Sequence, residues 1–268
     1  MDIELKAICA SSCAIIEEVA QFIREELGKV NASDIETKAL NSLVSYVDKT
    51  AEEQLVTQLK PLIPEATFLT EEETVEQENG TYRWIIDPLD GTTNFLHQIP
   101  FFAISVALQY REKTVIGIVY EVNRQECFSA WESGGCFLNG QPVHVSDTQV
   151  PQEALMATGF PYYDYSYMEG YLEVLRYLML NTRGVRRLGA AALDLAYVAC
   201  GRFDGFFEYS LSPWDVAAGA FLVQEAGGRV TDFQGGDDFV FGRSVIACNA
   251  GIFPEISAVV MGAFNPES

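Results

Sequence analysis

The sequence predicts a layered α/β fold, an α+β arrangement in which layers of helices alternate with sheets. Residues 2–28 carry apolar side chains at helical spacing, residues 102–138 form short apolar runs separated by turn signals, and strand-like and helix-like segments alternate from about residue 153. The 268 residues, 49% of them hydrophobic, can bury a large core as a single unit. We expect an N-terminal α+β half (1–150), a C-terminal α/β half (151–268) and a functional site at their junction.

The first two expected elements are helices. Residues 2–28 predict a packing helix that ends at a glycine. A loop at residues 31–34 is expected to lead into a second helical region that ends near Ile63. This region carries Asp48, and an aspartate on a helix is most often a surface residue.

Two short strands are then expected to end in acidic residues. Residues 67–70 run into Glu71, Glu72 and Glu73, and the apolar run 84–86 stops at Asp87-Pro88, with Asp90 three residues after Asp87. A run of glutamates is normally a solvated loop. Neighbouring strand ends in one sheet can, however, converge on one crevice. The sequence therefore suggests that these acids meet.

The residues after Asp90 are suited to binding an anion. Gly91 lets the backbone turn and approach a ligand closely. Thr92, Thr93 and Asn94 can open a helical turn, and the free N–H groups at its start favour anions. A dozen residues thus offer oxygen ligands for a cation and amide donors for a phosphate.

The remaining elements are scaffold with a few charged residues. A largely antiparallel meander is expected over 102–110, 115–122, 126–130 and 136–138. The C-terminal half is expected to contain strands at 155–158, 184–188, 203–209 and 244–248 and helices at 168–180, 190–200, 214–226 and 252–264. Arg186 and Arg187 lie in one of these strands, Glu208 near the end of another, and Asp215 at the start of a helix. Taken alone, Asp215 is explained by the helix dipole.

The composition excludes several classes of protein. The net charge is −21, from 17 basic and 38 acidic side chains, so we expect no nucleic-acid partner, because such binding relies on lysine and arginine. The sequence contains only two histidines, His97 and His144, which argues against a histidine-based catalytic triad and against a zinc site with several histidine ligands. The six cysteines include no C-x-x-C pair. The N-terminus resembles no signal peptide and no 18-residue apolar span occurs, so we expect no membrane association and a cytoplasmic protein.

The acidic segments resemble a known family. The stretch WIIDPLDGTTN (84–94), the stretch WDVAAG (214–219) and the following EAGG (225–228) are similar to the two signatures of the inositol monophosphatase family. LTEE (69–72) resembles its metal-binding glutamate segment, and GVRRLGAAA (184–192) its substrate-facing loop. The resemblance covers nearly the whole chain. It implies the layered sugar-phosphatase fold shared with fructose bisphosphatases and a Mg²⁺-dependent, Li⁺-sensitive phosphomonoesterase that forms a homodimer.

The resemblance also implies roles for individual residues. Two or three Mg²⁺ ions bind per site: Glu71, Asp87 and the Leu89 carbonyl hold the first, and Asp87, Asp90 and Asp215 hold the second. Thr92, with Glu71, orients a metal-bound water, and the amides of Gly91 and Thr92 receive the phosphate. The alcohol side is lined by Asp90, Gly189, Ala190, Ala191, Glu208 and Asp215. Asp48 matches an acid near the metals.

The implied reaction is hydrolysis of a small phosphate monoester, inositol 1-phosphate above all, by water and without a phosphoenzyme. Two metals can clamp the attacking and leaving oxygens and activate water, so no histidine base is needed. Alternatives remain open. The substrate could be fructose 1,6-bisphosphate, a 3′-phosphonucleotide, NADP or histidinol phosphate, with Arg186 and Arg187 holding a second phosphate. The chain could also be a regulatory scaffold that binds a macromolecule, although a scaffold has no need of five acids.

Overall fold

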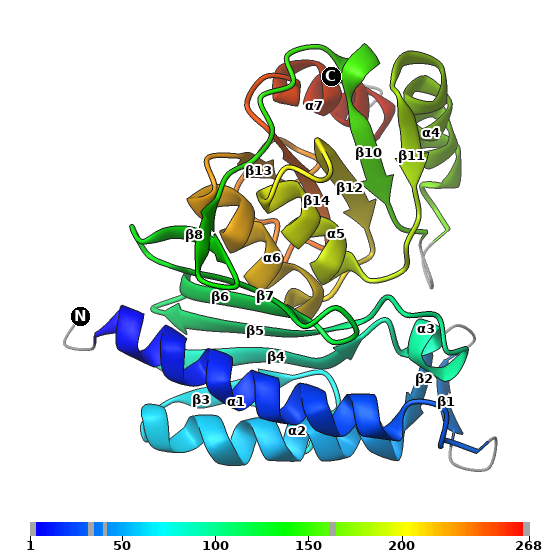
Figure 1. Ribbon diagram of the computed structural model, residues 1–268. Coiled ribbons are helices and arrows are strands. Elements are labelled where there is room, and N and C mark those ends of the chain that lie inside the picture. Colours follow the sequence, from blue (N-terminus) through cyan, green and yellow to red (C-terminus); the bar gives the residue numbers. More distant parts are fainter. Residues whose placement is uncertain (1–3, 32–34, 40–41, 161–164, 265–268) are drawn as a thin grey trace.

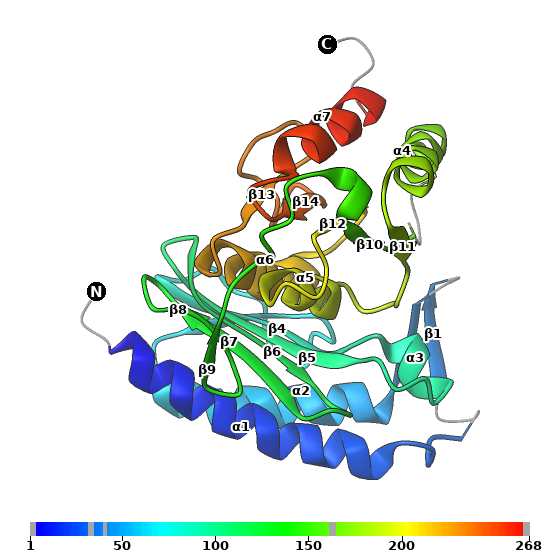
Figure 2. The same cartoon turned by 45° about the horizontal axis from the view of Figure 1, so that its top comes forward.

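The computed structural model describes residues 4–31, 35–39, 42–160 and 165–264. Its layers follow one another in the order helices, sheet, helices, sheet, helices (Figure 1). Helices α1 and α2 cover one face of a seven-stranded sheet, α5 and α6 lie between this sheet and a five-stranded sheet, and α4 and α7 cover the outer face of the latter (Figure 2). The predicted layered α/β fold is confirmed.

The N-terminal region differs from the prediction in one place. The first helix is confirmed as α1, Leu5–Glu26. The second helical region is wrong in its first part, because β1 (Ile35–Ala39) and β2 (Ser42–Ser45) form an antiparallel pair before α2 (Tyr46–Leu59) begins. The cause is a local cap: the N–H and hydroxyl of Ser45 both donate to Asp48 Oδ2, at 2.8 and 2.7 Å. This reciprocal capping fixes the helix start at residue 46.

The seven-stranded sheet is the expected meander, extended at both ends. Its order is β3-β4-β5-β6-β7-β8-β9, with β3 and β4 parallel and all later pairs antiparallel. The strands are β3 (Thr67–Thr70), β4 (Tyr82–Asp90), β5 (Ala103–Tyr110), β6 (Lys113–Glu121), β7 (Glu126–Trp131), β8 (Gly135–Leu138) and β9 (Gln141–Val143). The short strand β9 was not expected.

Strand β4 corrects a second prediction. The strand does not stop at Asp87-Pro88 but continues to Asp90, with a register shift against β5 between Asp87 and Asp90. Proline lacks the N–H for a ladder hydrogen bond and is tolerated in a strand at such an irregularity. The shift gives the chain room to present both aspartates.

The C-terminal half contains a mixed sheet of order β11-β10-β12-β14-β13. Strand β10 pairs in parallel with β11 and β12, whereas β14 pairs antiparallel with β12 and β13. Strands and helices are β10 (Leu155–Thr158), α4 (Met168–Asn181), β11 (Gly184–Arg186), α5 (Ala191–Ala199), β12 (Gly205–Tyr209), α6 (Pro213–Glu225), β13 (Arg229–Thr231), β14 (Ser244–Cys248) and α7 (Phe253–Phe264). All except β13 were predicted within a few residues.

The central helix layer lies close against the seven-stranded sheet at Gly117. A Cβ placed on Gly117 of β6 would lie 2.7 Å from the Ala218 carbonyl oxygen of α6, closer than real Cβ atoms approach. We therefore expect Gly117→Ala to destabilise the protein by about 1–3 kcal/mol through overpacking, measured by urea unfolding. Gly262→Ala in α7 is the control, because its Cβ meets nothing within 4 Å. Alanine there should be neutral or stabilising. Equal midpoints for the two variants would contradict this account.

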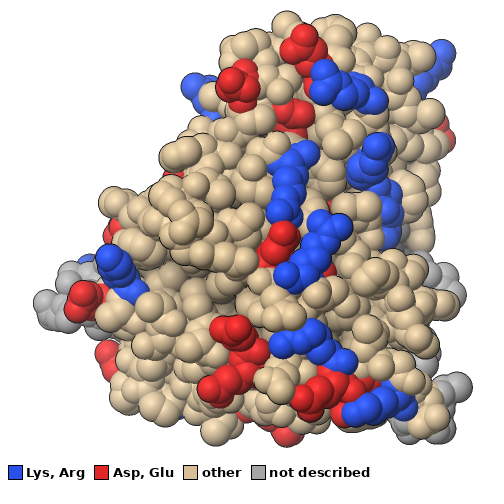
Figure 3. Space-filling model, viewed as in Figure 1, with Lys and Arg blue, Asp and Glu red and all other residues tan. Residues whose placement is uncertain are grey.

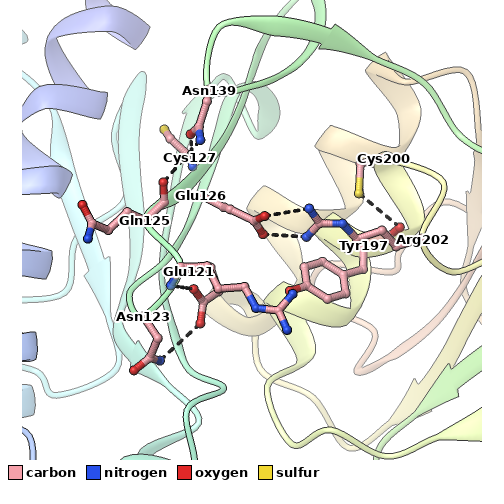
Figure 4. A network of polar contacts seen from close by, with 10 residues as sticks. Glu121, Asn123, Gln125, Glu126, Cys127, Asn139, Tyr197, Cys200 and Arg202 are labelled. Atoms are coloured by element: carbon pink, nitrogen blue, oxygen red, sulfur yellow. Dashed lines mark hydrogen bonds and ion pairs between the residues drawn. The ribbon is translucent and has the colours of Figure 1, made fainter.

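A polar network also joins the β6–β7 turn to α5 (Figure 4). Both guanidinium nitrogens Nη1 and Nη2 of Arg202 donate to the Glu126 carboxylate, at 2.5 and 2.7 Å. Arg124 Nη1 donates to the Tyr197 hydroxyl at 3.3 Å. Bidentate arginine–carboxylate pairs fix orientation as well as adding energy. The network thus ties the two halves together at one edge.

The surface mixes charges of both signs. On the face shown in Figure 3 basic and acidic side chains lie next to one another, so this face carries no continuous acidic field. In the described ranges, no helix is both long enough and apolar enough to span a bilayer.

Candidate active site

A cavity of about 390 Å³ opens between the two halves. The first half contributes residues of β4, α3 (Thr92–Leu96) and the segment after β3, and the second half contributes residues around α5, β12 and the start of α6. Eleven of the predicted site residues line it: Glu71, Asp87, Leu89, Asp90, Gly91, Thr92, Gly189, Ala190, Ala191, Glu208 and Asp215. The twelfth, Asp48, lies behind Thr92. Their chemical roles remain predictions.

Asp87 reaches this cavity because of strand alternation. Ile86 packs with α1 and α2 on one face of the sheet, so the next side chain points to the opposite face, toward α5 and α6. Asp87 is 1% exposed, and the Leu89 N–H donates to its Oδ1 at 2.9 Å. Burial, followed by the nearby charges of Glu71, Asp90 and Asp215, raises the pKa of Asp87 well above its usual value. The carboxylate therefore lies in an environment where a bound cation would be stabilising.

Asp90 is held by the start of α5. The Ala192 N–H donates to Asp90 Oδ2 at 2.7 Å, and this bond connects strand β4 to a helix a hundred residues later. Amides at a helix start stabilise an anion. Burial is nevertheless the larger effect and raises the pKa of Asp90 to about 7.

Asp215 lies in the first turn of α6. Its Oδ2 accepts from the Ser212 N–H at 2.7 Å, so Asp215 caps the helix start, whereas the sequence alone explained it by the helix dipole. Burial first, and then the charge of Asp90, raise its pKa to about 7. The cap explains why the helix begins here, but it does not explain why a third acid lines the same cavity as Asp87 and Asp90.

The segment that carries Glu71 is positioned by a residue that the sequence analysis did not single out. Glu52 of α2 is fully buried, and its carboxylate accepts from the N–H groups of Glu72 and Thr74 at 2.7 and 2.8 Å and from the Thr74 hydroxyl at 2.7 Å. Its spacing from Asp48 was the available signal, because residues four apart share one helix face. The glutamate run is therefore a loop that the Glu52 carboxylate of α2 holds in place, rather than a freely solvated loop.

Thr92 connects the cavity to Asp48. Gly91, with φ of +93°, turns the chain into α3, as predicted. The Thr92 hydroxyl lies 2.9 Å from Asp48 Oδ1 and 3.0 Å from the Leu89 carbonyl oxygen, so it can donate to either. Asp48 is 1% exposed, and burial raises its pKa. The expectation that a helical aspartate lies at the surface is thus wrong here.

Glu208 faces the cavity because Gly159 leaves space for it. A side chain at Gly159 would collide with the Glu208 carboxylate. Burial raises the pKa of Glu208 well above its usual value, while the Arg187 guanidinium opposes this effect. Arg187 lines the cavity, whereas Arg186 is exposed and does not. Of the two arginines considered for a second phosphate, the structure therefore brings only Arg187 to the site.

Asp194 is a further acid that the sequence analysis missed. It lies on α5 one helical turn beyond Ala190 and Ala191, lines the cavity and is 1% exposed. Burial and the charges of Glu208 and Asp90 raise its pKa well above the usual value. No motif marks it, but an aspartate inside the apolar run AALDLAYVA was a visible irregularity.

The donor set suits a hard divalent cation. Asp87 and Asp90 are buried, Asp215 is partly exposed, and all three line one cavity with raised pKa values. Carboxylate and carbonyl oxygens are the ligands that Mg²⁺ prefers. Among the described residues, no three acidic, histidine or cysteine side chains are already gathered closely enough to hold a metal ion. Side-chain rotation would thus have to draw the carboxylates together around a cation.

The raised pKa values give a testable pH dependence. Between about pH 4 and 7 folded Asp215 keeps a proton that the unfolded chain loses, so its contribution to stability falls as the pH rises through this window. In chelator, Asp215→Asn should therefore gain about 2 kcal/mol relative to wild type between pH 5.5 and pH 7.5. Urea unfolding at both pH values measures this difference. Asp237→Asn, at an exposed position, is the control, and a pH-independent difference for Asp215→Asn would contradict the assignment.

Comparisons with known proteins identify the family. Residues 4–261 match the model of the inositol monophosphatase family. A protein of Pseudomonas aeruginosa named Nus factor SuhB is 39% identical over 251 residues, which cover 92% of this chain and 93% of the relative. An inositol-1-monophosphatase of Mesorhizobium japonicum is 42% identical over 233 residues, covering 87% and 88%.

Solved structures show the same fold. The extragenic suppressor protein suhB of Bartonella henselae superposes with a TM-score of 0.89 at 38% identity, covering 95% of this chain and 98% of that one. The fold, the acidic motifs at the cavity and the family match across nearly the whole sequence lead to one conclusion: the chain belongs to the inositol monophosphatase family.

Proposed function

We propose that the protein is a Mg²⁺-dependent phosphatase that hydrolyses a small phosphate monoester, with inositol 1-phosphate as its substrate. The observation that carries this proposal is the convergence of buried Asp87 and Asp90 with the partly exposed Asp215 and Glu71 on one cavity, which Gly91 and Thr92 also line. We further propose that residues 1–150 and 151–268 work as a single unit with the site at their junction. Family membership also supports a homodimer and inhibition by Li⁺.

The acids would hold the cations in two overlapping sets. Glu71, Asp87 and the Leu89 carbonyl form one set, and Asp87, Asp90 and Asp215 form the other, with two or three ions per site. When bound, the ions supply neutralisation of phosphate charge and activation of the attacking water. The raised pKa values support this assignment, because a site that disfavours its own carboxylate charges gains by binding a cation.

The chain's own groups would orient the reactants. The Thr92 hydroxyl, fixed by Asp48 or by the Leu89 carbonyl, would position the attacking water together with Glu71. The amides of Gly91 and Thr92 would bind the phosphate oxygens. Phosphoryl transfer depends mainly on positioning and charge stabilisation, so water would attack directly and no phosphoenzyme would form. A stable ³²P-labelled protein would contradict this step.

The alcohol would be bound from the second half. Glu208, Asp90 and Asp215 present carboxylates, and Gly189, Ala190 and Ala191 form a wall of small residues beside them. Carboxylates accept hydrogen bonds from hydroxyl groups. This lining supports a polyhydroxylated alcohol such as inositol over the base of a nucleotide.

Phosphate release from a substrate panel tests the proposal. The panel contains inositol 1-phosphate, fructose 1,6-bisphosphate, a 3′-phosphonucleotide, NADP and histidinol phosphate, each with Mg²⁺, with Mg²⁺ plus Li⁺, and with chelator. We expect the highest kcat/KM for inositol 1-phosphate, loss of activity in chelator and inhibition by Li⁺. Faster release from a bisphosphate would favour the related phosphatases and a phosphate-binding role for Arg187.

A regulatory function has one observation in its favour, since the relative from Pseudomonas aeruginosa is named a Nus factor. Such a role would not require the acids to be functional. Absence of phosphate release from every substrate, despite folded protein and Mg²⁺, would favour this second function.

A further inference from the structure

Three of the six cysteines gather between helix α1 and strand β7, away from the candidate active site. Cys9 and Cys13 are one turn apart on α1, and Cys127 is on β7. All three pack against the same apolar core on the face of the sheet that α1 covers, and none lines the cavity. Each is a free thiol.

Contacts along α1 fix which residues of the helix and the strand are opposite each other. Lys6 Nζ lies 5.9 Å from the centroid of the Trp131 ring, and the Cys9 thiol lies 3.9 Å from the Ala130 carbonyl oxygen. Further along α1, Arg24 Nη1 donates to the Val122 carbonyl at 3.1 Å. The start of α1 therefore lies beside the end of β7, and the later turns of α1 extend beyond the start of that strand. Since four helical residues advance about 6 Å, Cys13 lies beside the first half of β7.

Strand alternation then turns Cys127 toward the helix. Phe128 and Ala130 pack against the α5–α6 layer, so Cys127 and Trp131 point to the opposite face. Figure 4 shows the Cys127 sulfur on the side of the strand that faces the N-terminal helix, away from Tyr197. The Cys127 N–H donates to Asn139 Oδ1 at 2.8 Å, which fixes the backbone there. Cys9 is 2% exposed, whereas Cys13 and Cys127 are only partly buried.

The three thiols also influence one another. Hydrogen bonds from Cys127, and then from Cys9, lower the pKa of Cys13 to about 4, and the same contacts raise the pKa values of Cys127 and Cys9. The lowered pKa favours the thiolate form at Cys13 over that of its two neighbours. Thiolates are the form that reacts with oxidants.

We propose that Cys13 and Cys127 form a peroxide-reactive dithiol that closes to a disulfide between α1 and β7. The Cys13 thiolate attacks one oxygen of a hydroperoxide, the O–O bond breaks, and the leaving oxygen takes a proton to become water or an alcohol. The resulting sulfenic acid is attacked by the Cys127 sulfur, an S–S bond forms, and the hydroxyl leaves as water. Two thiols are oxidised by two electrons, and one peroxide is reduced.

The disulfide would stabilise the fold without changing the active site. It would close a loop of 114 residues (127 − 13), and cross-links that close long loops constrain the unfolded chain most. We expect the oxidised protein to melt at least about 5 °C higher than the reduced protein. Reduction with dithiothreitol should reverse the shift.

Hydrogen peroxide added to the full-length protein tests this proposal. Free thiols under denaturing conditions should fall from six to four, and non-reduced peptide mapping should show a Cys13–Cys127 cross-link within one chain. Cys13→Ser and Cys127→Ser should each abolish the cross-link and the melting shift, whereas Cys200→Ser should retain both.

Because Cys9 is the third member, Cys9→Ser is a further variant and should still form the cross-link. Six free thiols after peroxide treatment, a cross-link between other cysteines or between chains, or Cys13 oxidised to sulfinic acid with Cys127 still free would each overturn the proposal. None of these outcomes depends on phosphatase activity.

Discussion

Asp87→Asn is expected to reduce Mg²⁺-dependent phosphate release by about a thousandfold or more, a loss of about 4 kcal/mol of transition-state stabilisation. Asp87 is the one carboxylate shared by both proposed ligand sets, and an amide cannot supply the same negative charge to two cations. The same substitution removes a buried carboxyl group. Burial and three neighbouring acids raise the pKa of this group. The variant should therefore be at least as stable as wild type in chelator.

The pair of measurements separates chemistry from folding. Phosphate release with Mg²⁺ gives kcat/KM, and thermal unfolding in chelator gives the stability of the same preparation. Asp147→Asn, at an exposed position, is the matched control and should retain full activity. Wild-type activity in Asp87→Asn would show that the metal assignment is wrong, and a large fall in stability would show that the loss is structural.

Thr92→Val should lower kcat by about a hundredfold while leaving KM nearly unchanged, since a group that positions the attacking water acts in the chemical step. Valine has nearly the shape of threonine but lacks the hydroxyl that lies 2.9 Å from Asp48 and 3.0 Å from the Leu89 carbonyl. Thr92→Ser keeps this hydroxyl and should retain most of the activity.

Thr93→Val is the control for the neighbouring position, because Thr93 also lines the cavity but is exposed. Steady-state kinetics on inositol 1-phosphate at saturating Mg²⁺ distinguish the outcomes. If valine at position 92 raises KM without lowering kcat, Thr92 binds substrate rather than orienting water.

Site residues could be predicted from the sequence where the pattern that marks them lies within a short stretch of the chain. Asp87, Asp90 and the turn at Gly91 lie within one short stretch, where turn chemistry and acid spacing can be read directly. Asp215 required the resemblance, because a capped helix start explains an aspartate equally well. In the structure Asp215 has both positions: it caps α6 through Ser212 and it lines the cavity.

The missed residues act through tertiary contacts that leave no pattern in the chain. Glu52 is one acid among several on α2, and its role depends on a loop twenty residues later folding over it. Asp194 is buried because α5 lies between two sheets, which no local propensity reveals.

Errors in the expected elements have a similar origin. The continuation of β4 through Pro88 depends on its irregular pairing with β5. The β1–β2 pair was overlooked because the Ser45–Asp48 cap was not recognised as the true start of the second helix.

The central claim is that the clustered acids of this cavity bind divalent cations. The most direct test is a crystal of the protein grown with Mn²⁺ as a substitute for Mg²⁺, measured for anomalous scattering at a manganese-sensitive wavelength. We predict anomalous peaks in the cavity about 2.0–2.3 Å from carboxylate oxygens of Asp87, with Glu71 on one side and Asp90 and Asp215 on the other. Well-diffracting crystals without an anomalous peak beside Asp87 at saturating Mn²⁺ would contradict the account.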